Sequence, residues 1–451
     1  MSQRRRRISL GMFLRPTGHH VAAWRHPDAA ADAGSNFKHF VSLAQTAERG
    51  LFDLLFCADI ATLWAGDNDS VSRIGTMARM EPYSLMVGLA AVTRHIGLVC
   101  TASTTYDEPF NLARRFATLD IISNGRAGWN LVTSQHEAEA ANFGRDEHMP
   151  KSQRYRRARE FAEVAQGLWD SFEEGAFLYD KTDGRLFDPA KLHTLDHKGE
   201  FFRVRGPLSV PTSPQRYPVM VQAGASDDGR DLAAAMAEIV FAAHNDIESA
   251  RACYADIKGR AAALGRDPGS VRIMPGFVPF VGRTRAEAQE KFQTLQKLIH
   301  PQVGVRMLSH YMGHDLSGYP IDGPLPEIPE THSGLASRTA LLTAVARRDG
   351  LTIRQLYERV AGGRGHFQAI GSASDIVDIM VEWVETGAAD GFNVMPPLFP
   401  TALEDFVELV VPELQRRGLH RTRYEGNTLR DHLGLAMPLS RHARRPAPRS
   451  G

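Results

Sequence analysis

Short apolar runs recur along this chain and alternate with longer segments whose apolar residues follow helical spacing. The eight runs cover residues 8–14, 52–58, 96–102, 127–132, 218–222, 239–243, 271–281 and 392–395. Strands that alternate with helices predict βα units around a parallel sheet. Eight such units predict a closed (β/α)8 TIM barrel of the α/β class, in which the loops after the strands build the active site.

The chain is much longer than a barrel alone requires. It has 451 residues, whereas a typical barrel has about 250. We expect one domain over residues 1–437, with insertions after strand four, at about 136–216, and after strand seven, at about 298–371. Residues 438–451, rich in Arg and Pro, are expected to form a disordered basic tail.

Several helices are predicted within and beyond these insertions. The first insertion contains an amphipathic pattern near residues 154–172, and the second contains helical patterns at 337–348 and 352–360. A last helix, at residues 402–410, is expected to stop or kink at Pro412, because proline cannot continue the backbone hydrogen bonding.

Composition narrows the classes of function. A formal net charge of +1 argues against binding to nucleic acid or to a membrane surface. No run approaches the roughly 20 apolar residues of a membrane span, and the basic start leads into too short a run for a signal peptide. Cys57, Cys100 and Cys253 form no spacing motif, and the first two fall inside predicted strands. We therefore expect buried thiols and a cytoplasmic protein.

The segment 222–229, Gln-Ala-Gly-Ala-Ser-Asp-Asp-Gly, joins strand five to a helix. Ser226 is expected to cap that helix, whose free N–H groups and dipole attract a phosphate. A cap without a ligand is the alternative, because Asp227 and Asp228 suit any helix start and repel anions. The local sequence leaves both interpretations open.

Polar side chains also follow strands two, three and four. Asp59 is the first polar residue after strand two, and Thr104 belongs to a hydroxyl-rich stretch after strand three. Asn130 lies on strand four, on the same face as Val132. An amide at the barrel mouth can bond the edge of a planar heterocycle. Each of these residues could equally serve a salt bridge, a turn or nearby backbone.

The densest chemical cluster follows strand one, in Gly-His-His-Val-Ala-Ala-Trp-Arg-His at residues 18–26. Its histidines and Arg25 could bind an anion or move a proton. His19 and His20 are adjacent and point to opposite faces of an extended chain, so no metal site is predicted. Lys151 and Tyr155 could reach the mouth, although a solvated helix start explains them more simply. The sequence has no dinucleotide fingerprint, phosphate-binding Walker loop or serine nucleophile elbow.

Longer stretches resemble the flavin-dependent, bacterial-luciferase-like monooxygenases. They are residues 11–27, 46–53, 104–110, 123–134 and 387–393. Within that family the chain is similar to the subgroup of nitrilotriacetate monooxygenase component A, which also includes sulfone, alkane and pristinamycin-type monooxygenases. The resemblance extends from about residue 8 to residue 437.

The resemblance implies that reduced FMN comes from a separate NAD(P)H:flavin oxidoreductase and reacts with O₂. The protein then holds the flavin, excludes water and positions a small organic substrate. By motif position, the flavin ring contacts are Asp59, Thr104, Asn130 and Val132. The ribityl-phosphate contacts are Lys151, Tyr155, Ala225 and Ser226. His20 is the catalytic residue, as a proton donor or a substrate anchor, and we also expect a homo-oligomer.

Two residues depart from the family pattern. Ala225 stands where relatives commonly have a second serine, which removes one phosphate donor. Lys151 stands where they often have histidine, and it could meet the phosphate as a point charge.

The substrate is left open. A nitrilotriacetate-like substrate implies oxidative N-dealkylation of an aminopolycarboxylate and needs cations at the mouth. His19 and Arg25 are the expected substrate contacts, with Arg15, His20 and His26 nearby. A sulfone, amine or alkane needs an apolar pocket instead. Deazaflavin-dependent hydride transfer and non-catalytic flavin binding are further alternatives.

Overall fold

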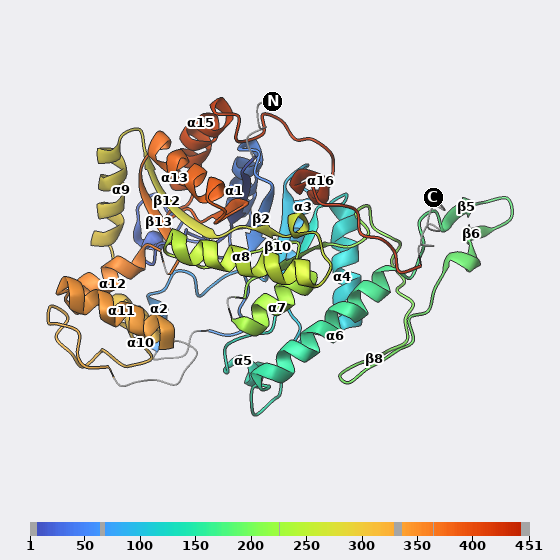
Figure 1. Ribbon diagram of the computed structural model, residues 1–451, viewed down its shortest axis with the longest axis horizontal. Coiled ribbons are helices and arrows are strands. Elements are labelled where there is room, and N and C mark those ends of the chain that lie inside the picture. Colours follow the sequence, from blue (N-terminus) through green and yellow to red (C-terminus); the bar gives the residue numbers. More distant parts are fainter. Residues whose placement is uncertain (1–6, 64–67, 225, 329–335, 364, 443–451) are drawn as a thin grey trace.

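The computed structural model describes residues 7–63, 68–224, 226–328, 336–363 and 365–442. Its central feature is a sheet of parallel strands (Figure 1) in the order β11-β10-β9-β4-β3-β2-β1-β14-β12-β13. The strands that correspond to the predicted runs are β1 (Ser9–Phe13), β2 (Leu54–Cys57), β3 (Gly97–Ser103), β4 (Ala127–Val132), β9 (Val219–Gln222), β10 (Ile239–Val240), β11 (Arg272–Ile273), β12 (Gly276–Gly282) and β14 (Gly391–Val394).

The sheet closes through the seventh predicted strand, which the structure divides into β11 and β12. β11 pairs with β10, and β12 pairs with β14. Between them, the Gly276 N–H donates to the Ala242 carbonyl (3.0 Å), and the Pro275 carbonyl accepts from the Asn393 N–H (3.0 Å). The strand is interrupted at Pro275 because proline has no N–H to donate to a neighbouring strand. The predicted (β/α)8 fold is confirmed.

Helices cover the outside of the strands. They are α1 (Phe37–Arg49), α3 (Pro82–Ala90), α4 (Pro109–Ile122), α6 (Lys151–Trp169), α7 (Asp227–Met236), α8 (Ile247–Ala263), α9 (Arg285–Lys297) and α13 (Ala373–Glu385). Trp129 of β4 is fully buried, and its ring centroid lies 5.8 Å from that of Phe116 in α4 and 5.7 Å from that of Phe161 in α6. Such packing makes α6 part of the barrel wall, although the sequence placed it in the first insertion. A second apolar cluster fills the barrel interior, with Leu54 and Val99 among its members.

Two additional parts lie on opposite sides of the barrel (Figure 1). After α6, hairpins β5 (Phe177–Asp180)–β6 (Arg185–Phe187) and β7 (His197–Lys198)–β8 (Arg203–Val204) form where only a polar stretch was expected. On the other side lie α10 (Pro301–Met312), α11 (Ala336–Asp349) and α12 (Ile353–Ala361). α11 and α12 confirm the two helices predicted in the second insertion, whereas α10 was not predicted. The remaining short helices are α2 (Asn68–Ser72), α5 (Glu139–Asn142) and the 3-10 turns η1 (Ala23–Arg25), η2 (Pro189–Lys191) and η3 (Pro268–Ser270).

The second insertion ends earlier than expected. Residues 367–371 were placed inside it, but Phe367–Ser372 forms β13, which pairs in parallel with β12 from Phe277 to Gly282. Its sequence, Phe-Gln-Ala-Ile-Gly-Ser, carries too little apolar alternation to predict a strand. Pairing with β12 supplies the stability that local propensity lacks.

The C-terminal part interrupts its last long helix as predicted. α14 (Thr401–Asp405) is followed by a π-helical stretch, η4 (Phe406–Val410), and then by α15 (Val411–Arg416), which contains Pro412. The wider π turns precede the proline, whose ring would otherwise crowd the carbonyl one turn earlier. Beyond α16 (Leu429–Leu433), the start of the expected tail differs from the prediction, because the Arg441 N–H donates to Asp170 Oδ2 (3.0 Å). Residues 443–451 lie outside the described residues.

A buried charged cluster ties the C-terminal segment to the starts of the first two strands. The fully buried carboxylate of Asp53 accepts a hydrogen bond from the Leu10 N–H (2.7 Å) and pairs with the Arg421 guanidinium. The Arg7 guanidinium lies 3.5 Å from the same carboxylate. Arg421 also donates to the His432 carbonyl (2.8 Å). The C-terminal segment therefore helps to hold the closed barrel.

Two buried histidines near this cluster make stability depend on pH. Burial disfavours the charged imidazole and lowers the pKa of His420 and of His432 from 6.5 to about 4. As the pH falls, these two histidines therefore become protonated at a higher pH in the unfolded chain than in the folded protein. The contribution of these two histidines is complete above pH 6.5 and is lost from there down to about pH 4, by on the order of 3 kcal/mol per histidine. Burial raises the pKa of Asp53 to about 7, and this carboxyl acts in the opposite direction.

We expect His420→Gln and His432→Gln each to flatten this dependence. The free energy of unfolding, measured between the unfolded and folded pKa values, should fall less steeply with decreasing pH in either variant than in the wild type. Identical slopes in wild type and both variants would show that other groups control acid unfolding.

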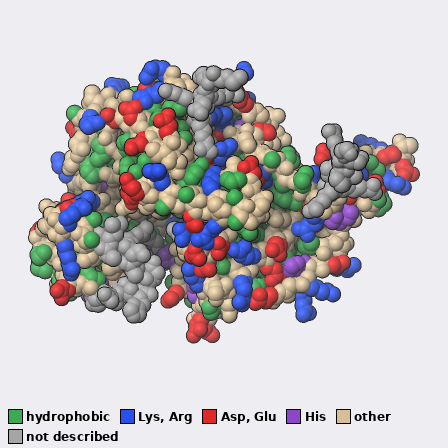
Figure 2. All heavy atoms as spheres, in the orientation of Figure 1, with side chains coloured by type: hydrophobic (Ala, Val, Ile, Leu, Met, Phe, Trp, Pro, Cys, Tyr) green, Lys and Arg blue, Asp and Glu red, His purple; other side chains and the backbone are tan. Residues whose placement is uncertain are grey.

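One face of the molecule shows no strong bias of charge. On the face shown in Figure 2, basic and acidic side chains are interspersed, in keeping with the formal net charge of +1. Among the described residues, no helix is both long and apolar enough to cross a membrane.

Candidate active site

A cavity of about 220 Å³ lies at the carboxyl ends of the strands, where barrels of this kind place their active sites. Its lining comes from strand ends that are far apart in the chain. The contributing residues include Phe13, Phe56, Ala58, Asp59, Thr101, Asn130, Val132, Glu139, Tyr155, Gln222, Gly224 and Phe241.

One wall of the cavity is aromatic. The ring centroids of Phe13, Phe56 and Phe241 lie 5.0, 5.5 and 5.2 Å apart pairwise. Such edge and tilted contacts are favourable and hold the rings rigidly. Sequence reasoning missed these residues; strand alternation could have placed Phe13 and Phe56 inside the barrel, but Phe241 follows a strand of only two residues.

Asn130 presents a hydrogen-bond acceptor at this cavity. Its amide Nδ2 donates to Thr101 Oγ1 (2.7 Å), which in turn donates to the Cys57 carbonyl (3.0 Å). The side chain is almost completely buried, and its Oδ1 has no hydrogen-bond partner among the described residues. An unsatisfied buried acceptor costs about 1–3 kcal/mol, so this oxygen suits a ligand that brings an N–H.

Two carboxylates line the same cavity. Asp59 accepts from the Ile60 N–H (2.9 Å), and its Oδ1 lies 4.0 Å from Nε of Arg79. Burial raises the pKa of Asp59, and the charge of Arg79 opposes that rise. Glu139, at the start of α5, is buried and accepts from the Ala61 N–H (2.9 Å). This arrangement holds Asp59 between a cation and the cavity.

The far end of the cavity has the features of an anion site. The Tyr155 hydroxyl of α6 and the Ser226 hydroxyl lie 3.2 Å apart, and Ser226 caps α7 by accepting from the Gly229 N–H (3.3 Å). Close packing shapes the preceding loop, because a Cβ at Gly224 would lie 2.3 Å from Nε2 of Gln222. The start of α7 therefore offers two hydroxyls and a helix dipole.

The aspartates of α7 do not face this site as free charges. Asp227 pairs with Arg260 (2.6 Å), and Asp228 pairs with Lys151 (3.0 Å). These ion pairs reduce the repulsion of an anion that the sequence led us to expect.

The structure brings together five of the predicted cofactor residues. Asp59, Asn130, Val132 and Tyr155 line the cavity, and Ser226 contacts Tyr155. Ala225 lies outside the described residues.

Thr104 and Lys151 are placed differently from the prediction. The Thr104 hydroxyl donates to the Val132 carbonyl (3.1 Å), so it serves the strand end, and Thr101 lines the cavity instead. The Lys151 ammonium pairs with Asp228 at the surface. Neither side chain is part of the cavity lining.

The side chains of the cluster after β1 bond to neighbouring chain segments. Nε2 of His19 bonds the Phe13 carbonyl (2.9 Å), and Nε2 of His20 bonds Oε1 of Gln296 in α9 (3.0 Å). The exposed Arg25 donates to the Leu298 carbonyl. These residues join the first loop to the chain around α9 and do not line the cavity. His19 also packs edge-on against Phe13, which lines the cavity, with ring centroids 4.6 Å apart.

Comparison with known proteins identifies the family. Residues 17–390 match the model of the luciferase-like monooxygenases. The chain belongs to this family. It is 52% identical over 446 residues to N-acetyl-S-(2-succino)cysteine monooxygenase of Bacillus subtilis, covering 98% of this chain and 100% of the relative. It is 48% identical over 442 residues to nitrilotriacetate monooxygenase component A of Aminobacter aminovorans, covering 96% of this chain and 97% of the relative.

Other relatives are monooxygenases of different substrates. A dibenzothiophene-sulfone monooxygenase of Rhodococcus erythropolis is 42% identical over 447 residues, covering 97% of this chain and 98% of the relative. The solved structure of DmoA from Hyphomicrobium sulfonivorans has a TM-score of 0.86 at 31% identity, covering 95% of this chain and 92% of that chain. The predicted family is confirmed, and the chain is a flavin-dependent monooxygenase.

Among the described residues, no group of three or more His, Cys, Asp or Glu side chains is arranged to hold a metal ion.

Proposed function

We propose that this protein is the oxygenase of a two-component system, which takes reduced FMN from a separate NAD(P)H:flavin oxidoreductase. With O₂ it oxygenates a small organic acid at a carbon that bears both a carboxylate and a nitrogen or sulfur atom. The observation that carries the proposal is the cavity, whose lining includes Asn130, with its unpartnered amide oxygen, and Tyr155, which contacts Ser226 at the start of α7. One relative is named component A, which supports a second component.

The cavity suits the chemistry of FMN. The aromatic wall fits a planar ring, and the unpartnered Oδ1 of Asn130 would accept from a ring N–H. Ser226, Tyr155 and the start of α7 bind the phosphate. Reduced flavin supplies the activation of O₂, while these side chains bind and orient the cofactor and exclude water.

The acid substrate is supported by the names of two relatives. N-acetyl-S-(2-succino)cysteine and nitrilotriacetate both carry a carboxylate on a carbon attached to sulfur or nitrogen, and the proteins named for them are 52% and 48% identical to this chain. The relative named for a sulfone is 42% identical. A sulfone, amine or alkane is the second candidate, which the aromatic wall of the cavity favours.

A substrate panel tests this function. The protein is supplied with FMN, NADH and a generic flavin reductase, and O₂ uptake and product are measured for N-acetyl-S-(2-succino)cysteine, nitrilotriacetate and dibenzothiophene sulfone. We expect product from at least one acid, in proportion to O₂ consumed, and peroxide without substrate. Turnover of the sulfone alone would contradict an acid substrate and favour the second candidate. Failure to bind FMN would contradict the whole proposal.

A further inference from the structure

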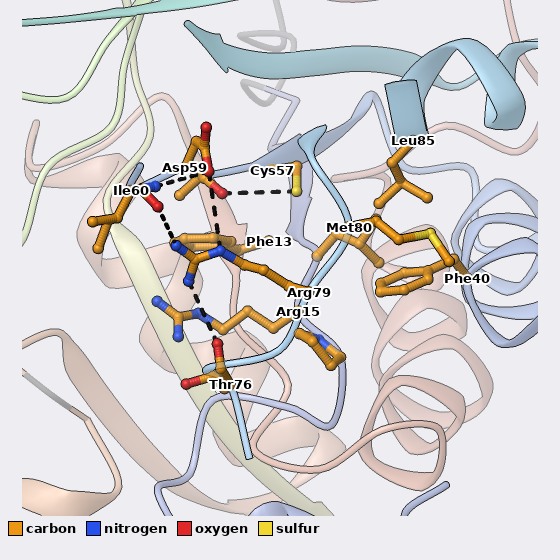
Figure 3. A pocket seen from close by; sticks show the side chains of 13 residues that line it. Phe13, Arg15, Phe40, Cys57, Asp59, Ile60, Thr76, Arg79, Met80 and Leu85 are labelled. Carbon is orange, nitrogen blue, oxygen red and sulfur yellow. Dashed lines mark hydrogen bonds and ion pairs between the residues drawn. The ribbon is translucent and has the colours of Figure 1, made fainter. Parts of the chain in front are cut away.

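A second, smaller pocket adjoins the proposed flavin cavity (Figure 3). It shares Phe13, Ala58, Asp59 and Ile60 with that cavity. The rest of its lining is apolar, except for Thr76 and two arginines. The apolar side chains include Leu14, Phe40, Cys57, Met80 and Leu85.

The size of this pocket limits what it can hold. Its volume is about 40 Å³, and a cavity needs roughly 10–15 Å³ by the same measure to hold one water molecule. It therefore accepts the end of a small molecule and excludes a whole substrate or a flavin ring. A carboxylate with the carbon that bears it has this size.

The two arginines give the pocket its chemical character. Arg15 comes from the loop after β1, and its guanidinium carbon lies 5.4 Å from the Phe13 ring centroid. Arg79 precedes α3, and its Nη2 donates to the Ile60 carbonyl (2.8 Å). Its Nε lies 4.0 Å from Oδ1 of Asp59. Figure 3 shows the two guanidinium groups next to each other.

The charged side chains of the lining are mainly basic. Arg15 and Arg79 contribute two cations, and Asp59 is the single carboxylate among the lining residues. Like charges held close together in a partly apolar pocket repel each other, and an anion between them relieves that repulsion. Guanidinium groups also match the geometry of a carboxylate.

We propose that this pocket is the subsite for a substrate carboxylate, and that Arg79 and Arg15 determine specificity for acids. The proposal rests on the proposed function, since a substrate carboxylate would bind here only if the neighbouring cavity holds the flavin. It replaces the expected anion recognition by Arg25, which is exposed and donates to the Leu298 carbonyl. Because the two pockets share Phe13 and Asp59, the carboxylate and the oxidised carbon of the substrate are separated by few bonds.

Neutralising each arginine tests the subsite. Arg79→Gln and Arg15→Gln are compared with the wild type on N-acetyl-S-(2-succino)cysteine and on its analogue with all three carboxylates replaced by carboxamides, which is similar in shape but uncharged. We expect the wild type to prefer the acid in kcat/KM, and each variant to lower that preference at least tenfold, mainly through KM. Arg79→Lys should restore part of it, because the charge remains while the paired N–H groups are lost.

The controls separate this subsite from the flavin site. Arg73→Gln removes an exposed arginine that pairs with Asp69 (2.9 Å) and lines neither pocket, so it should keep the wild-type preference. FMN affinity, followed by quenching of flavin fluorescence, should change less than threefold in Arg15→Gln and Arg79→Lys.

Two results would overturn the subsite and leave the proposed function intact. In the first, the wild type binds FMN and oxygenates the acid and the carboxamide equally well. In the second, the arginine variants keep the full preference for the acid. A wild type that fails to bind FMN would overturn both proposals.

Discussion

Replacing Ser226 by aspartate is expected to weaken FMN binding more than a hundredfold while leaving the fold intact. Ser226 lies at the start of α7, 3.2 Å from the Tyr155 hydroxyl, where we place the FMN phosphate. Two unit charges about 5 Å apart repel by about 3 kcal/mol at an effective dielectric constant near 20. The neighbouring Asp227 and Asp228 pair with Arg260 and Lys151. Arg230, 3.6 Å from Asp227, also pairs with Asp256 (3.2 Å), so the three cations nearest this helix start are already shared with other carboxylates.

Ser226→Asn is the matched control for this effect. Asparagine and aspartate have nearly the same shape and both cap helices well, so the two variants should unfold at the same temperature and differ in FMN affinity alone. The affinities for oxidised and reduced FMN are measured by fluorescence quenching, the latter without O₂. Similar affinities in both variants would show that the phosphate lies elsewhere.

The second large effect is expected at the base of the barrel. Arg421→Met removes the buried partner of Asp53, a carboxylate that is completely inaccessible to solvent. A buried charge that loses its partner costs about 3–5 kcal/mol. Arg7, 3.5 Å from the same oxygen, offsets part of this loss, as does proton uptake by Asp53, because burial already raises its pKa to about 7. We expect the free energy of unfolding at neutral pH, measured in urea, to fall by up to this amount.

A second substitution separates charge from packing. Adding Asp53→Asn to Arg421→Met should recover part of the lost stability, because a neutral amide still accepts from the Leu10 N–H and brings no charge. A loss below about 1 kcal/mol in Arg421→Met, as for an exposed ion pair, would contradict a structural role of this pair.

The barrel could be predicted because its strands are buried on both faces and therefore read as apolar runs. β2, Leu54–Cys57, is buried at every position. β13 was not predicted because Phe367–Ser372 mixes polar and apolar residues without a clear alternation and depends on pairing with β12. The hairpins after α6 escaped for a similar reason, since β5 is largely exposed.

The site was predictable where regular structure fixes the direction of a side chain. Asn130 lies on a strand, and Ser226 caps a helix, so their directions follow from the backbone. Arg79 lies in an irregular connection, and no periodicity in the sequence brings it next to Asp59. His20 was expected at the reacting face; its Nε2 bonds Oε1 of Gln296 (3.0 Å), and its catalytic role stays a prediction.

The most direct test is a single turnover without reductase or NADH. The protein is loaded with reduced FMN in the absence of O₂, mixed with N-acetyl-S-(2-succino)cysteine or nitrilotriacetate, and then exposed to O₂. We predict oxygenated product in proportion to the bound reduced FMN, and none with oxidised FMN or without O₂. Product from oxidised flavin or without O₂, or no product from any acid when the flavin site is filled, would contradict a reduced-FMN oxygenase of organic acids.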